Sequence, residues 1–244
     1  MQGGDLLSRF GVEVRTEQFR VSHKDFDVMS TPPLEFQGGG RFDDPSDSME
    51  HESQRYRVLY TGESAKSAFL ETLARYRYRL KTIESMLADT MLSVDERDDA
   101  AASQGDSGVI PSDWQQKFQL TKGRIMTSAP VFDLTRADSV QTLRTYLAPS
   151  LIALGLEDLD FSHVLSDNRD LTRAISRWLW TMTTQSGEPL FSGIRYCSRF
   201  DPECICLALY EGRFSIDGDI DIQPITPETP GFAEAASILR LQIA

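Results

Sequence analysis

Three side chains that could do chemistry together lie close in the sequence. Arg41 follows the glycines of GGGRFDD, Tyr60 ends the short apolar run RVLY, and Glu71 lies in SAFLETL. A guanidinium pairs with phosphate oxygens through two donors. A fixed carboxylate stabilises the positive charge that develops on a sugar carbon as a glycosidic bond breaks, and a phenol ring can stack on a planar base. These three groups could hold a dinucleotide and cleave its glycosidic bond.

A strand and a helix must position Tyr60 and Glu71. Residues 55–60 alternate with period two, which predicts a strand with Tyr60 on one of its faces. A helix capped near Ser64 should follow. The residues of its apolar stripe are Ala65, Ala68, Phe69, Thr72, Leu73 and Tyr76. At about 100° per residue, Glu71 falls about 60° beyond the Ala68 edge of that stripe, where a helix can offer a carboxylate to a cleft.

The rest of the chain predicts one α+β domain over residues 1–244, with small central antiparallel or mixed sheets flanked by helices. Strand patterns occupy residues 12–22, 130–135, 193–199, 204–210 and 216–222. Helix patterns occupy residues 112–118, 138–147, 170–182 and 234–243, and we expect Pro149 to end the second of them. Residues 83–110 are rich in Asp, Glu, Ser and Ala and predict a mobile excursion.

Composition excludes several classes of function. A net charge of −12 and a pI near 4.7 argue against a general nucleic-acid binder and against adhesion to anionic membranes. The chain has no apolar run of about twenty residues, and MQGGDLLSRF lacks the regions of a signal peptide, so we expect a cytoplasmic protein. Cys197, Cys204 and Cys206 predict buried thiols in a reducing compartment. Histidines and cysteines lack metal-ligand spacing, so we expect no metal and no prosthetic group.

The chain resembles the RES-domain family, named for its Arg, Glu and Ser. Its signature of Gly-Gly-Arg, an aromatic residue and Asn or Asp matches residues 39–43, and the later tyrosine and glutamate match Tyr60 and Glu71. An earlier arginine matches Arg20 in QFRVS, and a serine near the C-terminus matches Ser198 in RYCSR, where Cys197 replaces a frequent proline. The resemblance covers roughly residues 19–211, with residues 44–53 as a predicted insertion.

The resemblance implies an ADP-ribosyltransferase-like fold and the activity of a cytosolic toxin that degrades NAD+. On this interpretation Glu71 stabilises the cationic ribose, Arg41 and Arg20 bind the pyrophosphate, Tyr60 stacks on nicotinamide, and Ser198 donates to a phosphate or to the nucleophile. The nucleophile is water or, as co-substrate, inorganic phosphate. The family also implies a helix-turn-helix antitoxin of the Xre type as partner. The oligomeric state, including a homo-oligomer, stays open.

Other interpretations of the same residues remain. Glu71 could pair with Arg75 on the helix surface, and Arg41 could close a turn with the aspartates that follow it. Tyr60 could be a core aromatic residue and Ser198 an ordinary strand serine. At the level of function, the alternatives are an ADP-ribosyltransferase that modifies a macromolecule, with residues 83–110 as a target-recognition loop, and a binding module without turnover.

Overall fold

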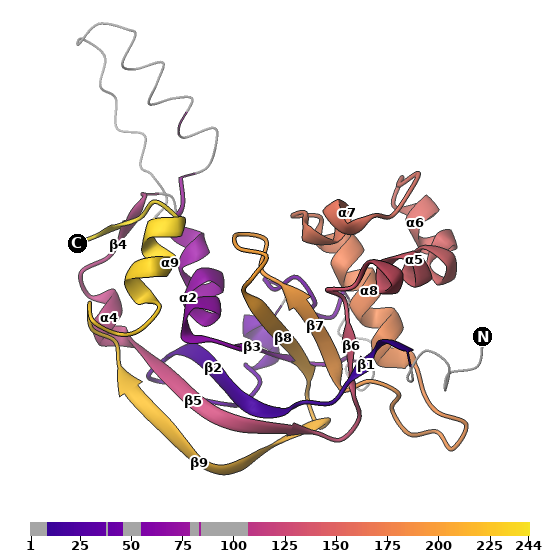
Figure 1. Cartoon of the computed structure of the whole chain (residues 1–244), viewed down its shortest axis with the longest axis horizontal. Helices are drawn as coiled ribbons and strands as arrows, with labels where there is room; N and C mark the ends of the chain where they lie inside the picture. Colours follow the sequence, from indigo (N-terminus) through magenta and orange to yellow (C-terminus); the bar gives the residue numbers. More distant parts are fainter. Residues whose placement is uncertain (1–8, 38, 46–54, 79–82, 84–106) are drawn as a thin grey trace, which may run out of the picture.

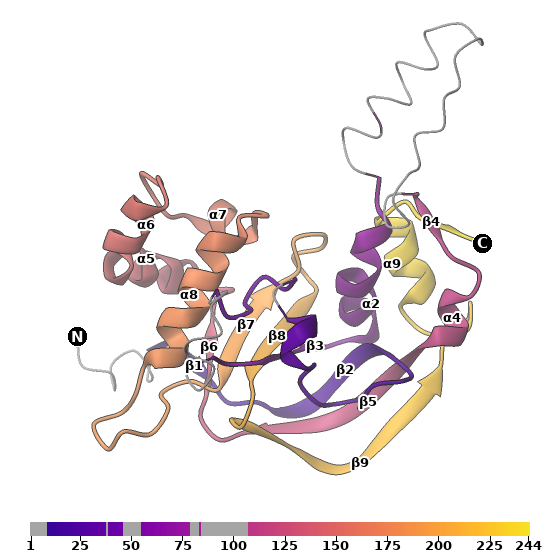
Figure 2. The same cartoon turned by 180° about the vertical axis from the view of Figure 1, so that it is seen from behind.

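A computed structural model describes residues 9–37, 39–45, 55–78, 83 and 107–244. Its centre is an eight-stranded mixed sheet with the order β1-β6-β7-β8-β3-β2-β5-β9, accompanied by a two-stranded sheet of β4 and β10. Figures 1 and 2 show two groups of helices at opposite ends of the sheet, α2 and α9 at one end and α5 to α8 at the other. Strands β3, β7 and β8 run between the two groups.

The middle of the sheet brings distant segments together. β3 (Val58–Gly62) pairs antiparallel with β8 (Ile205–Tyr210) and, at one position, with β2 (Arg15–His23). β2 pairs along its whole length with β5 (Phe118–Thr127), which also pairs with β9 (Phe214–Pro224). On the other side, β8 pairs with β7 (Gly193–Cys197), and β7 runs parallel to β6 (Val131–Asp133). β1 (Gly11–Val12) closes that edge.

One helical group packs around α2 (Ala65–Leu73), which follows β3 directly. The Ser64 hydroxyl accepts a hydrogen bond from the Ser67 amide at 3.1 Å, so the predicted N-cap is confirmed. α9 (Phe232–Ile238) packs against α2, and the Phe69 and Phe232 rings lie 5.3 Å apart. Trp114 of α4 (Trp114–Lys117) stacks on Phe232, with their ring centroids 5.8 Å apart. This aromatic core fixes the helix that carries Glu71.

The second helical group consists of α5 (Ala137–Tyr146), α6 (Ala148–Ala153), α7 (Phe161–Leu165) and α8 (Arg169–Thr181). On α8, Leu171, Ile175 and Leu179 follow the predicted i, i+4 spacing and are fully buried. They belong to a core cluster with Phe132 of β6 and Ile194 of β7. The helix therefore packs against the part of the sheet formed by β6 and β7.

The α+β architecture and most predicted elements are confirmed, but the sheet is larger than expected because β5 was missed. Its Lys122 and Arg124 interrupt the apolar pattern, and each pairs with an acidic residue of a neighbouring strand, Glu17 of β2 and Asp217 of β9. The helix predicted at 138–147 is α5, which ends just before Pro149 as expected. The sequence patterns missed the short helix α6 that follows, in which Pro149 lies in the first turn, where its missing N–H costs nothing.

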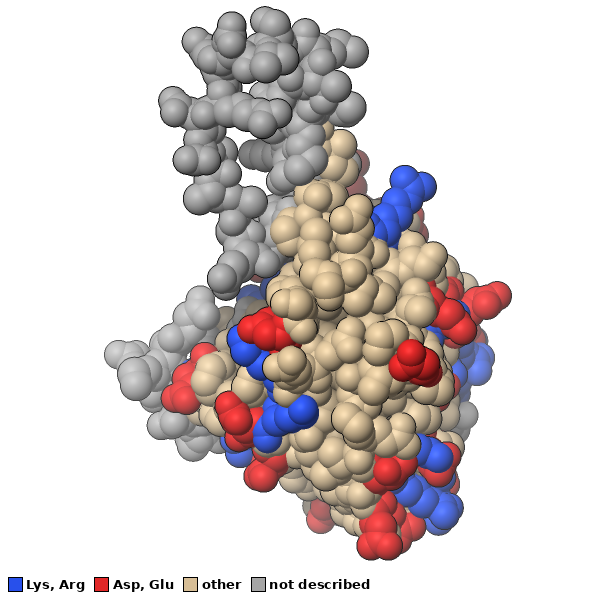
Figure 3. All heavy atoms as spheres, turned by 90° about the vertical axis from the view of Figure 1, so that its left-hand side faces the viewer, with Lys and Arg blue, Asp and Glu red and all other residues tan. Residues whose placement is uncertain are grey.

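The predicted excursion at residues 83–110 lies largely outside the described residues. Of its last residues, β4 (Val109–Ile110) pairs in parallel with β10 (Gln242–Ile243). All three cysteines are buried and free, as predicted. No helix within the described ranges is long and apolar enough to cross a membrane. On the face shown in Figure 3, acidic and basic residues alternate around a largely uncharged surface.

Candidate functional site

A cavity of about 170 Å³ lies between α2 and strands β2, β3 and β7. Its lining includes Arg20, Pro32, Tyr60, Glu71, Thr72 and Tyr196. Three of the five residues predicted from the sequence, Arg20, Tyr60 and Glu71, therefore meet at one hollow. They come from three different elements that the sheet order and the turn after β3 bring together.

Ser198 fixes the carboxylate of Glu71. The Ser198 hydroxyl donates to Glu71 Oε1 at 2.7 Å, a distance typical of a strong O–H···O⁻ bond. Ser198 is fully buried just beyond the end of β7; its own amide donates to Cys204 O at 2.8 Å, and its hydroxyl accepts from Phe200 N. Arg75, the alternative partner of Glu71, donates instead to Thr72 O. The structure thus joins the Glu71 carboxylate to Ser198 and not to Arg75, so the alternative of an ion pair on the helix surface does not hold.

The Tyr60 hydroxyl is held from two sides. It donates to Asp43 Oδ1 at 2.8 Å and accepts from the Phe42 amide at 2.9 Å. Burial, reinforced by the negative charge of Asp43, raises the pKa of Tyr60 well above its ordinary value, so the phenol stays neutral. The ring packs against the core and also lines the cavity, so both interpretations of this residue hold in part.

Arg20 contributes a positive charge to the cavity wall. Its Nη1 donates to the carbonyl oxygens of Val28 at 3.0 Å and Ser30 at 2.5 Å. Burial lowers the pKa of Arg20 to about 10, which still leaves the guanidinium charged at neutral pH. Part of its donor capacity therefore holds the segment that leads to Pro32, another residue of the cavity lining.

Arg41 is placed differently from Arg20. Its side chain is 8% exposed, it donates from Nη2 to the Val164 carbonyl, and it is not among the residues that line the cavity. The guanidinium carbon lies 5.4 Å from the ring centre of Phe42 and 5.3 Å from that of Tyr196, which does line the cavity. Within the described part of the chain, Nε and Nη1 of Arg41 are buried without a hydrogen-bond partner. Arg41 therefore supports the cavity from behind its wall.

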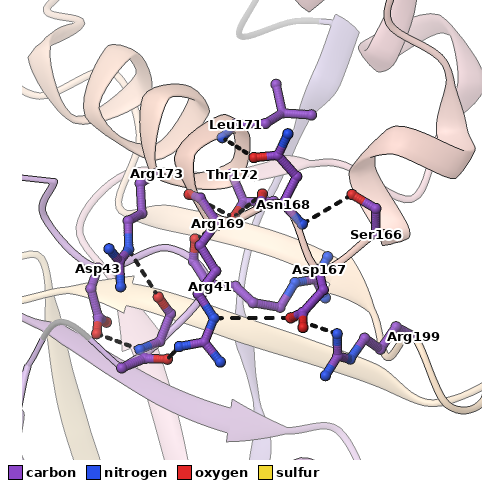
Figure 4. Close-up of polar contacts among 12 residues, drawn as sticks. Arg41, Asp43, Ser166, Asp167, Asn168, Arg169, Leu171, Thr172, Arg173 and Arg199 are labelled. Carbon is purple, nitrogen blue, oxygen red and sulfur yellow. Dashed lines mark hydrogen bonds and ion pairs between the residues drawn. The ribbon is translucent and has the colours of Figure 1, made fainter. Parts of the chain in front are cut away.

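The aspartates after Arg41 have other roles than a simple turn. Asp43 accepts from the Gly40 amide at 2.6 Å as well as from Tyr60. Asp44 pairs with Arg177 of α8 at 3.1 Å. Figure 4 shows that α8 and the residues just before it surround this loop with polar side chains. From the sequence, Asp43 was part of the glycine signature and α8 was a predicted helix, and neither had a predicted role in the site. Each acts through a contact with or within the glycine loop, which the sequence patterns do not show.

Two further arginines near β7 point elsewhere. Arg195 donates to Glu63 at 2.8 Å and lines a second, larger hollow of about 520 Å³ that contains none of the predicted site residues. Arg199 pairs with Asp167 at 2.6 Å. We regard the smaller cavity as the candidate site because it joins a fixed carboxylate, a cation and a neutral phenol.

The chain is similar to known proteins in sequence signature and, more distantly, in structure. A chain in the crystal structure of the M. tuberculosis MbcT–MbcA toxin–antitoxin complex is similar over 96% of both chains, with 13% sequence identity and a TM-score of 0.47. No curated protein sequence matches significantly. The family model of the RES domain matches residues 17–227, a range that includes every residue of the cavity lining together with Arg41 and Ser198. The chain belongs to the RES-domain family.

Proposed function

We propose that this protein is a toxin-like enzyme that cleaves the bond between nicotinamide and ribose in NAD+, by phosphorolysis or by hydrolysis. One observation carries the proposal: the Glu71 carboxylate, held at 2.7 Å by Ser198, lines the same cavity as Arg20 and Tyr60. The known activity of the family, degradation of NAD+, agrees with this set of groups.

Glu71 acts on the sugar. As the C1′–N bond breaks, its electron pair leaves with nicotinamide, which becomes neutral, and positive charge grows on C1′. A carboxylate beside that carbon stabilises the charge. Ser198 donates to Oε1 and leaves Oε2 for the ribose. Water or phosphate then attacks C1′; water loses a proton to solvent, and phosphate forms a new C1′–O bond.

Tyr60 and the arginines act on the remainder of the substrate. The neutral Tyr60 ring stacks on nicotinamide and sets its angle to the ribose. The Nη1 group of Arg20 already donates to two carbonyl oxygens. Arg20 therefore attracts the pyrophosphate through its positive charge and not through a hydrogen bond from Nη1. Arg41 has open donors at Nε and Nη1 among the described residues, so it can contribute to anion binding if substrate entry moves the Tyr196 ring. In a chain of net charge −12, such local cations are needed to hold a dianion.

We further propose a cytoplasmic role regulated by an antitoxin with a helix-turn-helix of the Xre type, which would cover the cavity. The family to which the chain belongs supports this partner. Its test is co-purification of the two proteins and loss of turnover in the complex.

The decisive experiment incubates the purified protein with NAD+, with and without inorganic phosphate, and identifies products by mass. ADP-ribose and nicotinamide in phosphate-free buffer indicate hydrolysis, whereas a phosphorylated ADP-ribose that requires phosphate indicates phosphorolysis. Transfer of labelled ADP-ribose to a lysate protein without free product would favour the transferase, whose recognition segment at 83–110 lies largely outside the described residues. Intact NAD+ under all three conditions refutes the proposal.

A further inference from the structure

One side of α8 donates hydrogen bonds to four consecutive carbonyl groups of the glycine loop. Figure 4 shows three of the donor residues, Arg169, Thr172 and Arg173, beside this loop. The four donors lie at positions i, i+3, i+4 and i+7 and so share one face of the helix. The bonds are Arg169 Nη1 to Gly39 O, Arg173 Nε to Gly40 O at 3.4 Å, Thr172 Oγ1 to Arg41 O at 2.5 Å, and Ser176 Oγ to Phe42 O at 2.7 Å. Thr172 and Ser176 are fully buried, so these two bonds are shielded from water.

The Thr172 bond reaches the candidate site through a single rigid group. The Arg41 carbonyl and the Phe42 amide belong to the same planar peptide. The Thr172 hydroxyl donates to the carbonyl oxygen of this peptide. The N–H of the same peptide, which belongs to Phe42, donates to the Tyr60 hydroxyl at 2.9 Å. The Tyr60 hydroxyl in turn donates a hydrogen bond to Asp43 Oδ1. A displacement of the peptide must therefore displace the Tyr60 hydroxyl.

The glycine loop leaves little room for Tyr60 to settle elsewhere. A Cβ added to Gly40 would lie 2.7 Å from Tyr60 Cε2 and closer still to the Tyr60 hydroxyl. The Gly40 amide also donates to Asp43 Oδ2, on the same carboxylate that accepts the hydrogen bond of the Tyr60 hydroxyl. The tyrosine is thus packed against the loop as well as hydrogen-bonded to it.

We propose that Thr172 is a positioning residue for Tyr60, acting through the Arg41–Phe42 peptide. Thr172 is buried on α8 and is not part of the cavity lining, so it acts on Tyr60 and not on substrate. Bonds at both ends of one peptide polarise each other, which strengthens the hold on the Tyr60 hydroxyl. The inference rests on the proposed function, in which the Tyr60 ring sets the angle of nicotinamide.

The test uses full-length protein labelled with 3-fluorotyrosine. The chain has seven tyrosines, and Tyr60→Phe identifies the Tyr60 line in the fluorine spectrum. Thr172→Val removes the donor at nearly constant shape and should shift that line and lower kcat for nicotinamide release about fivefold, the effect of one typical buried hydrogen bond. KM should change less than about twofold, because the Tyr60 ring still stacks on nicotinamide and only the angle that it sets is altered. Thr172→Ser keeps the hydroxyl and should restore both readouts.

Thr142→Val is the matched control. Thr142 lies on α5, and its hydroxyl donates to the Asp138 carbonyl within its own helix, so this change should leave the Tyr60 line and kcat at wild-type values. If Thr172→Val does not fold, Thr172→Cys, with a weaker donor, takes its place.

If the Tyr60 line does not shift in folded Thr172→Val, or in the Thr172→Cys variant that replaces it, the proposal is overturned. A shifted line with unchanged kcat, or a shift that Thr172→Ser does not reverse, overturns it as well. If the wild-type protein releases no nicotinamide, the proposed function fails, while the fluorine line still decides whether Thr172 fixes Tyr60.

Discussion

Replacement of Glu71 by glutamine removes one negative charge from the cavity and changes little else. In the wild-type protein the Ser198 hydroxyl donates to Glu71 Oε1 at 2.7 Å, and glutamine keeps an oxygen that can accept this bond. Glutamine also has about the same helix propensity as glutamate. The position is half-buried on α2, so the packing of the helix should persist. We therefore expect the fold and the affinity for NAD+ to remain close to wild type and the chemical step to slow.

The size of the effect follows from the charge that is lost. A carboxylate about 4 Å from a full positive charge contributes about 4 kcal/mol at an effective dielectric constant of about 20. The transition state carries most but not all of that charge, so a loss of about 2–4 kcal/mol is expected. This corresponds to a decrease in kcat of about 30- to 1000-fold.

Turnover is measured by nicotinamide release at saturating NAD+, and binding by calorimetry on the same preparation. Glu63→Gln is the matched control, since Glu63 lies just before α2 and bonds to Arg195 outside the cavity. It should turn over at the wild-type rate. A kcat for Glu71→Gln within about threefold of wild type, with binding intact, would remove the carboxylate from the mechanism.

Three further predictions follow from the same geometry. Ser198→Ala should lower kcat about 10- to 150-fold by freeing the Glu71 carboxylate, since hydrogen bonds to charged groups contribute about 1.5–3 kcal/mol; a wild-type rate would show that Glu71 needs no anchor. Gly40→Ala should lower the melting temperature and the turnover because its Cβ meets Tyr60, whereas Gly39→Ala, which has open space, should do neither; equal effects would contradict the contact. Burial raises the pKa of Tyr56, Tyr60, Tyr196 and Tyr210, so the folded state keeps protons that the unfolded chain loses above about pH 10. The tyrosine contribution to the free energy of unfolding should be constant below that pH and fall above it, as urea titrations between about pH 8 and 11 can measure; a rise would refute the assignment.

Local sequence patterns were sufficient to predict the strand and the helix, β3 and α2, that carry Tyr60 and Glu71. The alternation before Tyr60 predicted β3, the serine cap predicted the start of α2, and the i, i+4 leucines and isoleucine predicted α8. Each of these signals arises from neighbours within a few residues, so the sequence contains them directly. Strand β5 was not predicted, because Lys122 and Arg124 interrupt its apolar pattern. Their charges are paired with Glu17 and Asp217, which lie on neighbouring strands but far away in the chain.

The sequence by itself determined which groups are available: a carboxylate on the border of a helix, a tyrosine at the end of a strand, and arginines in a strongly acidic chain. Only the tertiary structure decided what they touch. It joined Glu71 to Ser198 across 127 positions, kept Arg20 at the cavity, and buried Arg41 against Val164 and Tyr196. It also brought α8 onto the loop that holds Tyr60. These contacts depend on strand pairing and helix packing between segments far apart in the chain, and no spacing along one segment encodes the direction in which a side chain finally points.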